Sequence, residues 1–142
     1  MLLIGLLAGC NNCPDFDDIE VRAGPHVGAE KVDYVERAVE AFRGWTNADG
    51  ACTDEIRLVP NIQVGRQEAA GRYLLRSDTI LLDHTASAYE LYSVALHELC
   101  HGIIRERPWL QDSFGEHFSG GVQRDRLPRG LLPPGGDLRE GV

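Results

Sequence analysis

The sequence predicts an α+β domain in which a small, mainly antiparallel or mixed sheet packs against one buried helix. Three observations lead to this prediction: helical spacing of apolar residues over 29–42, several short runs with the period of a strand, and an unusually apolar helical run over 87–105. The chain has 142 residues, of which 43% are hydrophobic and 25% charged. This suits one globular domain and is too short for two of ordinary size.

The first half of the chain should contain a strand, a helix and a second strand. Residues 19–21 alternate apolar and polar side chains and are followed by a Gly-Pro turn. A second strand is expected over 55–64, bent or interrupted at Pro60. Between them, one face of the predicted helix over 29–42 carries the apolar residues Val32, Val35, Val39 and Phe42.

The second half should contain a tight hairpin and then the longest helix. Two strands are expected over 73–75 and 79–82, joined by a short turn. The helix over 87–105 carries more apolar residues than a surface helix needs, so we expect it to be the central buried element. A further short helix is expected over 112–122. The order strand, helix, strands, helix is that of an α+β domain.

The N-terminus predicts export to the bacterial cell envelope. An apolar run over 1–9 ends at Cys10, and the tetrapeptide LAGC at 7–10 resembles the lipobox, whose cysteine is lipidated. No Lys or Arg precedes the run, which departs from that pattern, and a buried N-terminal strand or helix is the alternative. Asn11 after the cysteine implies, by the same resemblance, an outer-membrane lipoprotein that faces the periplasm or the exterior. Attachment through lipid is expected, since a membrane-spanning helix needs roughly 20 residues.

The expected organisation is a signal peptide over 1–9, a lipidated N-terminus and linker over 10–16, a folded domain over 17–125, and a tail rich in Gly and Pro over 126–142. The net charge of −8 argues against a nucleic-acid partner, because scattered Lys and Arg residues cannot neutralise a phosphate backbone. We expect a monomer.

Four cysteines are present, and lipidation of Cys10 would leave three, an odd number for an oxidising compartment. One disulfide and one free thiol is then the simplest outcome. We favour a pair between Cys13 and Cys52, with Cys100 buried. A bridge between Cys52 and Cys100 is the alternative, and the sequence does not separate the two.

The buried helix contains the residues HELCH at 97–101, which form the pattern HExxH. Residues four apart lie one turn apart on the same side of a helix, so His97 and His101 can reach a single ion. Zinc lowers the pKa of a bound water to about 7, and Glu98 can accept its proton as a general base. Surface histidines on an ordinary helix are the alternative, although these three side chains are costly to bury in so apolar a helix without a role.

On this motif, residues 70–122 resemble the zincin metallopeptidases. The resemblance implies a minimal zincin-like domain, a zinc cofactor, and a protein or peptide as substrate. In that superfamily an edge strand ahead of the motif helix aligns the substrate in extended form. Residues 79–82 would take this role here, and a plain core strand is the alternative.

A catalytic zinc usually has three protein ligands and a water. The chain lacks the glycine and the last histidine of the metzincin pattern HExxHxxGxxH. The residues 109–121 are instead similar to the tryptophan-leucine and glutamate-glycine segment of small gluzincin domains, with His117 where glycine is common, and this implies Glu116 as the third ligand. His117 is the alternative, because imidazole suits zinc equally well, and Asp112 is a further candidate.

The expected activity is zinc-dependent hydrolysis of peptide bonds. The alternative is a non-catalytic lipoprotein that keeps a zincin fold for binding or for structure, and a third class is a zinc hydrolase of non-peptide amides or esters. Two further residues were weighed against plain structural roles. His84 is a candidate for stabilising an oxyanion across the cleft, or else an exposed turn residue. Cys100 could touch the metal, but packing or bridging is favoured.

Overall fold

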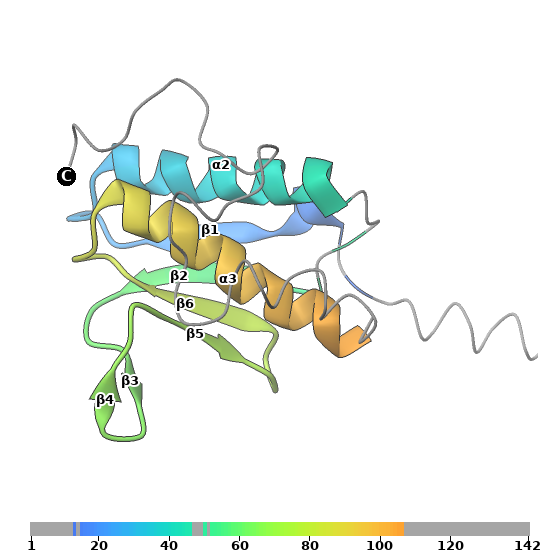
Figure 1. Ribbon diagram of the computed structural model, residues 1–142. Coiled ribbons are helices and arrows are strands. Elements are labelled where there is room, and N and C mark those ends of the chain that lie inside the picture. Colours follow the sequence, from blue (N-terminus) through green and yellow to red (C-terminus); the bar gives the residue numbers. More distant parts are fainter. Residues whose placement is uncertain (1–12, 14, 47–49, 51, 107–142) are drawn as a thin grey trace, which may run out of the picture.

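The computed structural model describes residues 13, 15–46, 50 and 52–106, which form a sheet with two helices on one of its faces (Figure 1). This part of the chain is an α+β arrangement with a mixed sheet, as the sequence predicts. In chain order the elements are η1 (Phe16–Asp18), β1 (Glu20–Ala23), α2 (Ala29–Thr46), β2 (Glu55–Val59), β3 (Gln63–Val64), β4 (Gln67–Glu68), β5 (Gly71–Leu74), β6 (Thr79–Asp83) and α3 (Ala88–Glu106).

The main sheet has the strand order β1-β2-β6-β5. The pairs β1–β2 and β2–β6 are parallel, whereas β5 pairs with β6 in antiparallel fashion. Of the two sheet types expected, the mixed sheet is therefore the one present, and not a mainly antiparallel one. The physical reason is the crossover: α2 carries the chain back to the starting end of the sheet, so β2 must run in the same direction as β1.

The position of β6 separates the two alternatives for residues 79–82. The edge strand that the resemblance implies is wrong, and the core strand is what the structure contains, because β6 lies between β2 and β5. A strand that is apolar at successive positions suits the interior of a sheet, and β6 contains Ile80, Leu81 and Leu82 in a row. The edge strand β5 begins at Gly71, and glycine is depleted in strands.

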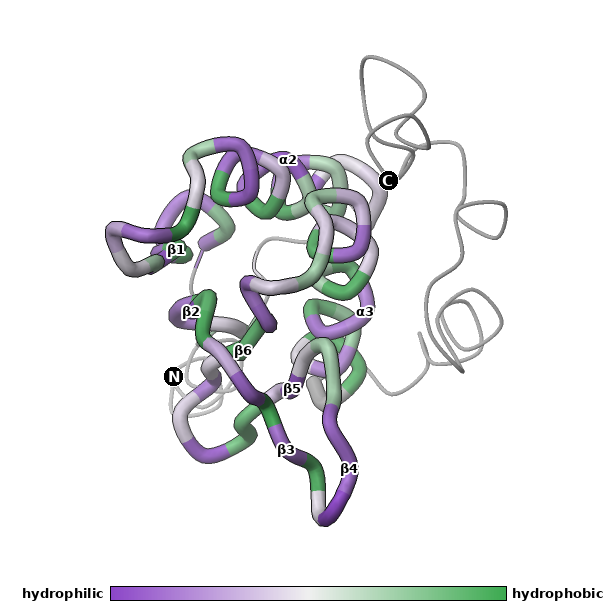
Figure 2. Tube along the Cα trace, turned by 90° about the vertical axis from the view of Figure 1, so that its left-hand side faces the viewer, coloured by the Kyte–Doolittle hydropathy of each residue, from purple (hydrophilic) through white to green (hydrophobic). Residues whose placement is uncertain are grey.

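Both helices pack on the same face of the main sheet and against each other (Figure 1). Viewed from the side, α2 and α3 lie together on one side of the strands, and their turns alternate between hydrophobic and hydrophilic residues (Figure 2). The β3–β4 hairpin projects beyond the sheet. The shared core contains Val35, Ala38 and Phe42 of α2, Ile56 and Leu58 of β2, Ile80 and Leu82 of β6, and Leu91, Leu96 and Leu99 of α3.

One disulfide joins Cys13 to Cys52, and Cys100 is a buried free thiol. The structure therefore contains the favoured pairing and not the bridge between Cys52 and Cys100. The hydroxyl of Tyr73 on β5 donates a hydrogen bond to the carbonyl oxygen of Cys52. This contact links the disulfide to the edge strand of the sheet.

Several expectations fall on residues outside those described: the signal peptide over 1–9, lipidation at Cys10, the short helix over 112–122, and the tail over 126–142. In the part of the chain that is described, no helix combines the length and the apolar character that a membrane span requires.

Breaking the disulfide should lower the free energy of unfolding by about 2–4 kcal/mol, because the bond closes a loop between residues 39 positions apart. Urea unfolding with and without dithiothreitol measures this difference. The variant Cys13→Ser should unfold at the same urea concentration under both conditions, close to the midpoint of the reduced protein. If the urea midpoint of the wild type were the same with and without dithiothreitol, the prediction would be contradicted.

Candidate metal centre

Helix α3 serves both the core and the candidate site. It begins after Ser87, whose Oγ accepts a hydrogen bond from the backbone N–H of Glu90 at 3.2 Å, as an N-cap residue does. One face of the helix buries Leu91, Leu96 and Leu99 completely. This burial determines the direction of the side chains that lie between those positions.

His97 and His101 bring their ring nitrogens together on α3. Their Nε2 atoms are 3.3 Å apart, and the ring planes are inclined by 75°. Two nitrogens that each lie about 2.0–2.1 Å from a tetrahedral ion are separated by about 3.3–3.4 Å, so the pair has the spacing that a zinc ion requires. The same distance is longer than an ordinary hydrogen bond between nitrogen and oxygen.

Glu98 completes a group of three potential ligand side chains whose donor atoms all lie within 4.8 Å of one another. Its Oε1 is 4.0 Å from Nε2 of His97. Only 5% of Glu98 is exposed, and burial raises the pKa of its carboxyl to about 7, because a low-dielectric environment disfavours the ionised form. A carboxyl group in this environment can hold or release a proton near neutral pH.

His101 is exposed at the surface of α3. The protein around its ring nevertheless removes part of its hydration, which lowers its pKa. A lower pKa favours the neutral imidazole, and this is the form that binds a metal ion.

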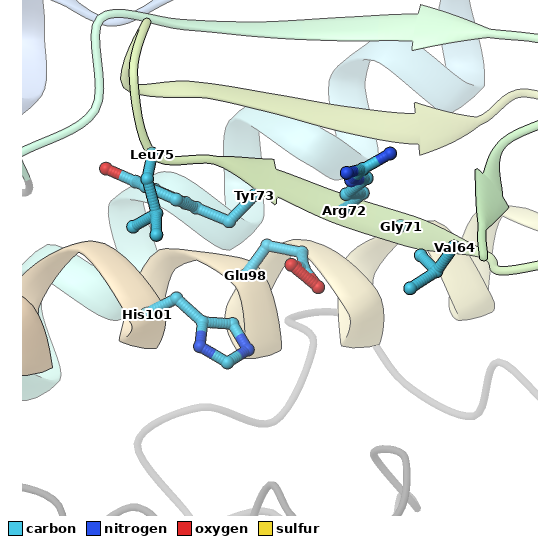
Figure 3. Close-up of a pocket in the computed structure, with 7 residues that line it drawn as sticks. All are labelled: Val64, Gly71, Arg72, Tyr73, Leu75, Glu98 and His101. Carbon is cyan, nitrogen blue, oxygen red and sulfur yellow. The ribbon is translucent and has the colours of Figure 1, made fainter.

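A cavity of about 280 Å³ lies between α3 and the strands, and Glu98 and His101 line its helical side. Residues of β3, β5 and the turn after β5 line the opposite side. Figure 3 shows Glu98 placed between α3 and β5, with His101 beside it on the same helix. The proton-accepting carboxyl group and one candidate ligand thus face the same space.

The close approach of β5 to α3 depends on Gly71. A Cβ atom at this position would lie 2.4 Å from Cγ1 of Val94, 3.2 Å from Cγ of Glu98 and 3.2 Å from the backbone oxygen of Leu81. Gly71 belongs to none of the motifs found in the sequence. A glycine inside a strand is the available signal, since it often marks a close approach of another segment.

The remaining sequence predictions have mixed outcomes. Glu116, His117 and Asp112, the candidates for the third ligand, lie outside the described residues. Among the residues that are described, no further His, Cys, Asp or Glu side chain joins the group of three. Cys100 is buried in the core instead. His84 lies in the turn after β6, as in the alternative to an oxyanion role; it is not among the residues that line the cavity, and its ring lies against that of His26.

Substitution of Gly71 by alanine should lower the free energy of unfolding by about 1–3 kcal/mol, because the new methyl group has no space between β5 and α3. Urea unfolding measures the effect. The matched control is Gly44→Ala on α2, where a Cβ would meet nothing within 4 Å and where alanine favours the helix. If the Gly71→Ala protein were as stable as the control variant, β5 and α3 would have to lie farther apart at this position than the structure shows.

In protein freed of metal by a chelator, the folded state should lose stability as the pH rises from about 5 to about 8. The pKa of Glu98 is raised from its ordinary 4.5 to about 7, so the folded chain keeps a proton that the unfolded chain has released. The loss should begin above pH 4.5, level off only once the pH has passed the folded-state pKa of about 7, and amount to about 3 kcal/mol.

Urea unfolding at several pH values tests this dependence, with Glu98→Gln as the comparison. The free energy of unfolding of the glutamine variant should lack the pH dependence that Glu98 causes. Relative to the wild type, the variant should therefore become more stable as the pH increases. Parallel pH profiles of the two proteins would contradict the assignment of the dependence to Glu98.

Comparisons of the chain with family models, with curated proteins and with solved structures found no match. The functional argument therefore rests on the geometry of His97, Glu98 and His101 and on the cavity beside them.

Proposed function

We propose that the protein is a zinc-dependent metallopeptidase with a minimal zincin-like domain. In this proposal His97 and His101 hold the ion, and Glu98 is the general base. One observation carries the proposal: two imidazole nitrogens at the spacing of zinc ligands lie beside a buried carboxyl group at a cavity. Glu116 is the proposed third ligand, with His117 as the alternative.

A bound zinc ion supplies Lewis acidity, which makes water a stronger acid and polarises the carbonyl group of a substrate. The residues of the chain supply the remaining functions. Glu98 takes the proton of the attacking water and delivers it to the departing amine. Gly71 leaves room for the Glu98 side chain beside β5, since a Cβ at position 71 would lie 3.2 Å from Cγ of Glu98.

The edge strand β5 supports a polypeptide as the substrate. Among the strands that the structure describes, β5 pairs with β6 alone. Such an edge presents backbone N–H and C=O groups to which an extended peptide can bind as an added strand. The cavity beside this edge is also lined by Val64 and Leu75, two large hydrophobic residues that are 49% and 61% exposed. They favour apolar side chains in the substrate.

The location is part of the proposal. We infer that the protein is an envelope lipoprotein attached through Cys10, at the outer membrane. The disulfide between Cys13 and Cys52 supports an oxidising compartment such as the bacterial periplasm.

Glu98→Gln should reduce the cleavage rate by about 10²–10⁴-fold, because the amide cannot accept the proton of the attacking water. Zinc content should stay at the wild-type value, since the two histidines remain. Cleavage of quenched fluorescent peptides and metal analysis of the same preparations measure the two quantities. The matched control is Glu36→Gln, which removes an exposed carboxylate from α2 and should leave the rate unchanged.

Full activity of Glu98→Gln would refute the mechanism. A wild-type protein that binds zinc but cleaves no member of a diverse peptide set would favour a non-catalytic lipoprotein module. Hydrolysis of esters or small amides without peptide cleavage would assign the same centre to a different substrate class.

A further inference from the structure

A second pair of histidines lies outside the candidate centre. His26 belongs to the loop after β1, and His84 belongs to the loop after β6. Both loops follow the carboxyl ends of strands that run parallel to β2. They therefore lie at the same end of the strands. The residues are 58 positions apart in the chain, but their Nε2 atoms are 3.4 Å apart.

The geometry of this pair nearly repeats that of the candidate metal centre. The ring centroids are 4.9 Å apart and the planes are inclined by 78°, compared with 5.0 Å and 75° for His97 and His101. The distance between the Nε2 atoms again equals the separation of about 3.3–3.4 Å that two nitrogen ligands have on a tetrahedral ion. It is long for a direct hydrogen bond.

Two hydrogen bonds fix the backbone at His84, and the ring of His26 lies close to the backbone of Gly24. The N–H of His84 donates to the carbonyl oxygen of Val59 at 3.1 Å, and Nζ of Lys31 donates to the carbonyl oxygen of His84 at 2.7 Å. The ring of His26 lies over Gly24, where a Cβ would come within 2.7 Å of its Cε1. Two loops positioned in this way lose little freedom when an ion joins them.

One positively charged and one negatively charged side chain lie near the two histidines. Lys31 brings a positive charge, but its ammonium group is bound to a backbone carbonyl. Asp83 directly precedes His84 and carries a carboxylate. Its Oδ1 accepts hydrogen bonds from the backbone N–H and the hydroxyl of Thr85. A cation between the two rings therefore meets charges of both signs.

We propose that His26 and His84 form a second metal site, with two imidazole ligands and with water in the remaining positions. Among the described residues, no third His, Cys, Asp or Glu completes this pair as Glu98 completes the other. Imidazole ligands suit the divalent ions Zn²⁺, Ni²⁺ and Cu²⁺. The bound ion would join the loops after β1 and β6 and is independent of the proposed peptidase chemistry.

Isothermal titration of chelator-treated protein with Zn²⁺ alone tests the second site. Wild-type protein should bind two ions, and His26→Ala and His84→Ala should each bind one in the same concentration range, with the second bound at least about tenfold more weakly. The double variant His97→Ala/His101→Ala should keep one ion. Adding His84→Ala to that double variant should weaken the remaining ion to the same degree.

The control is His117→Ala in the double variant, which removes the last other histidine of the chain and should leave the retained ion in place. The inference is overturned if the double variant binds no zinc, or if His26→Ala and His84→Ala leave its zinc affinity unchanged. If the first centre fails to bind zinc, wild type and double variant will each bind one ion, and loss of that ion in His84→Ala still supports the second site.

Discussion

The packing of α3 against α2 and the sheet determines most of what the site can do. Leu91, Leu96 and Leu99 are completely buried, so the rotation of the helix about its axis is set by the core. Once that rotation is set, Glu98 and His101 line the cavity beside β5, and His97 lies one helical turn before His101. A change in the packing of the helix would move all three side chains together, because interiors are close-packed.

The contact between Gly71 and Glu98 connects the stability of the domain with its chemistry. A buried carboxyl group is costly when ionised, and the strand that passes over it removes much of its water. The same strand is the open edge of the sheet. The features that suit Glu98 to proton transfer and those that offer a peptide a place to bind therefore come from one element, β5.

The two histidine pairs reach the same geometry by different routes. His97 and His101 are neighbours on one helix turn, so local structure alone brings them together. His26 and His84 meet because two parallel strands with one strand between them end at the same edge of the sheet. The first pair is visible as a motif in the sequence, and the second has no local signature.

The local sequence pattern was enough to predict several helices and strands of this protein and the three residues of the candidate site. The apolar spacing over 29–42, the hairpin over 73–82 and the helix over 87–105 predicted elements that the structure contains, and HExxH placed His97, Glu98 and His101 on one helix. Strand order was decided only by the tertiary structure, because the pairs β1–β2 and β2–β6 join segments that are distant in the chain. For the same reason the sequence left open whether 79–82 form an edge strand or a core strand, and it showed neither the fit of Gly71 against Glu98 nor the meeting of His26 with His84. Periodicity reports which face of an element is buried, and long-range packing decides what that face touches.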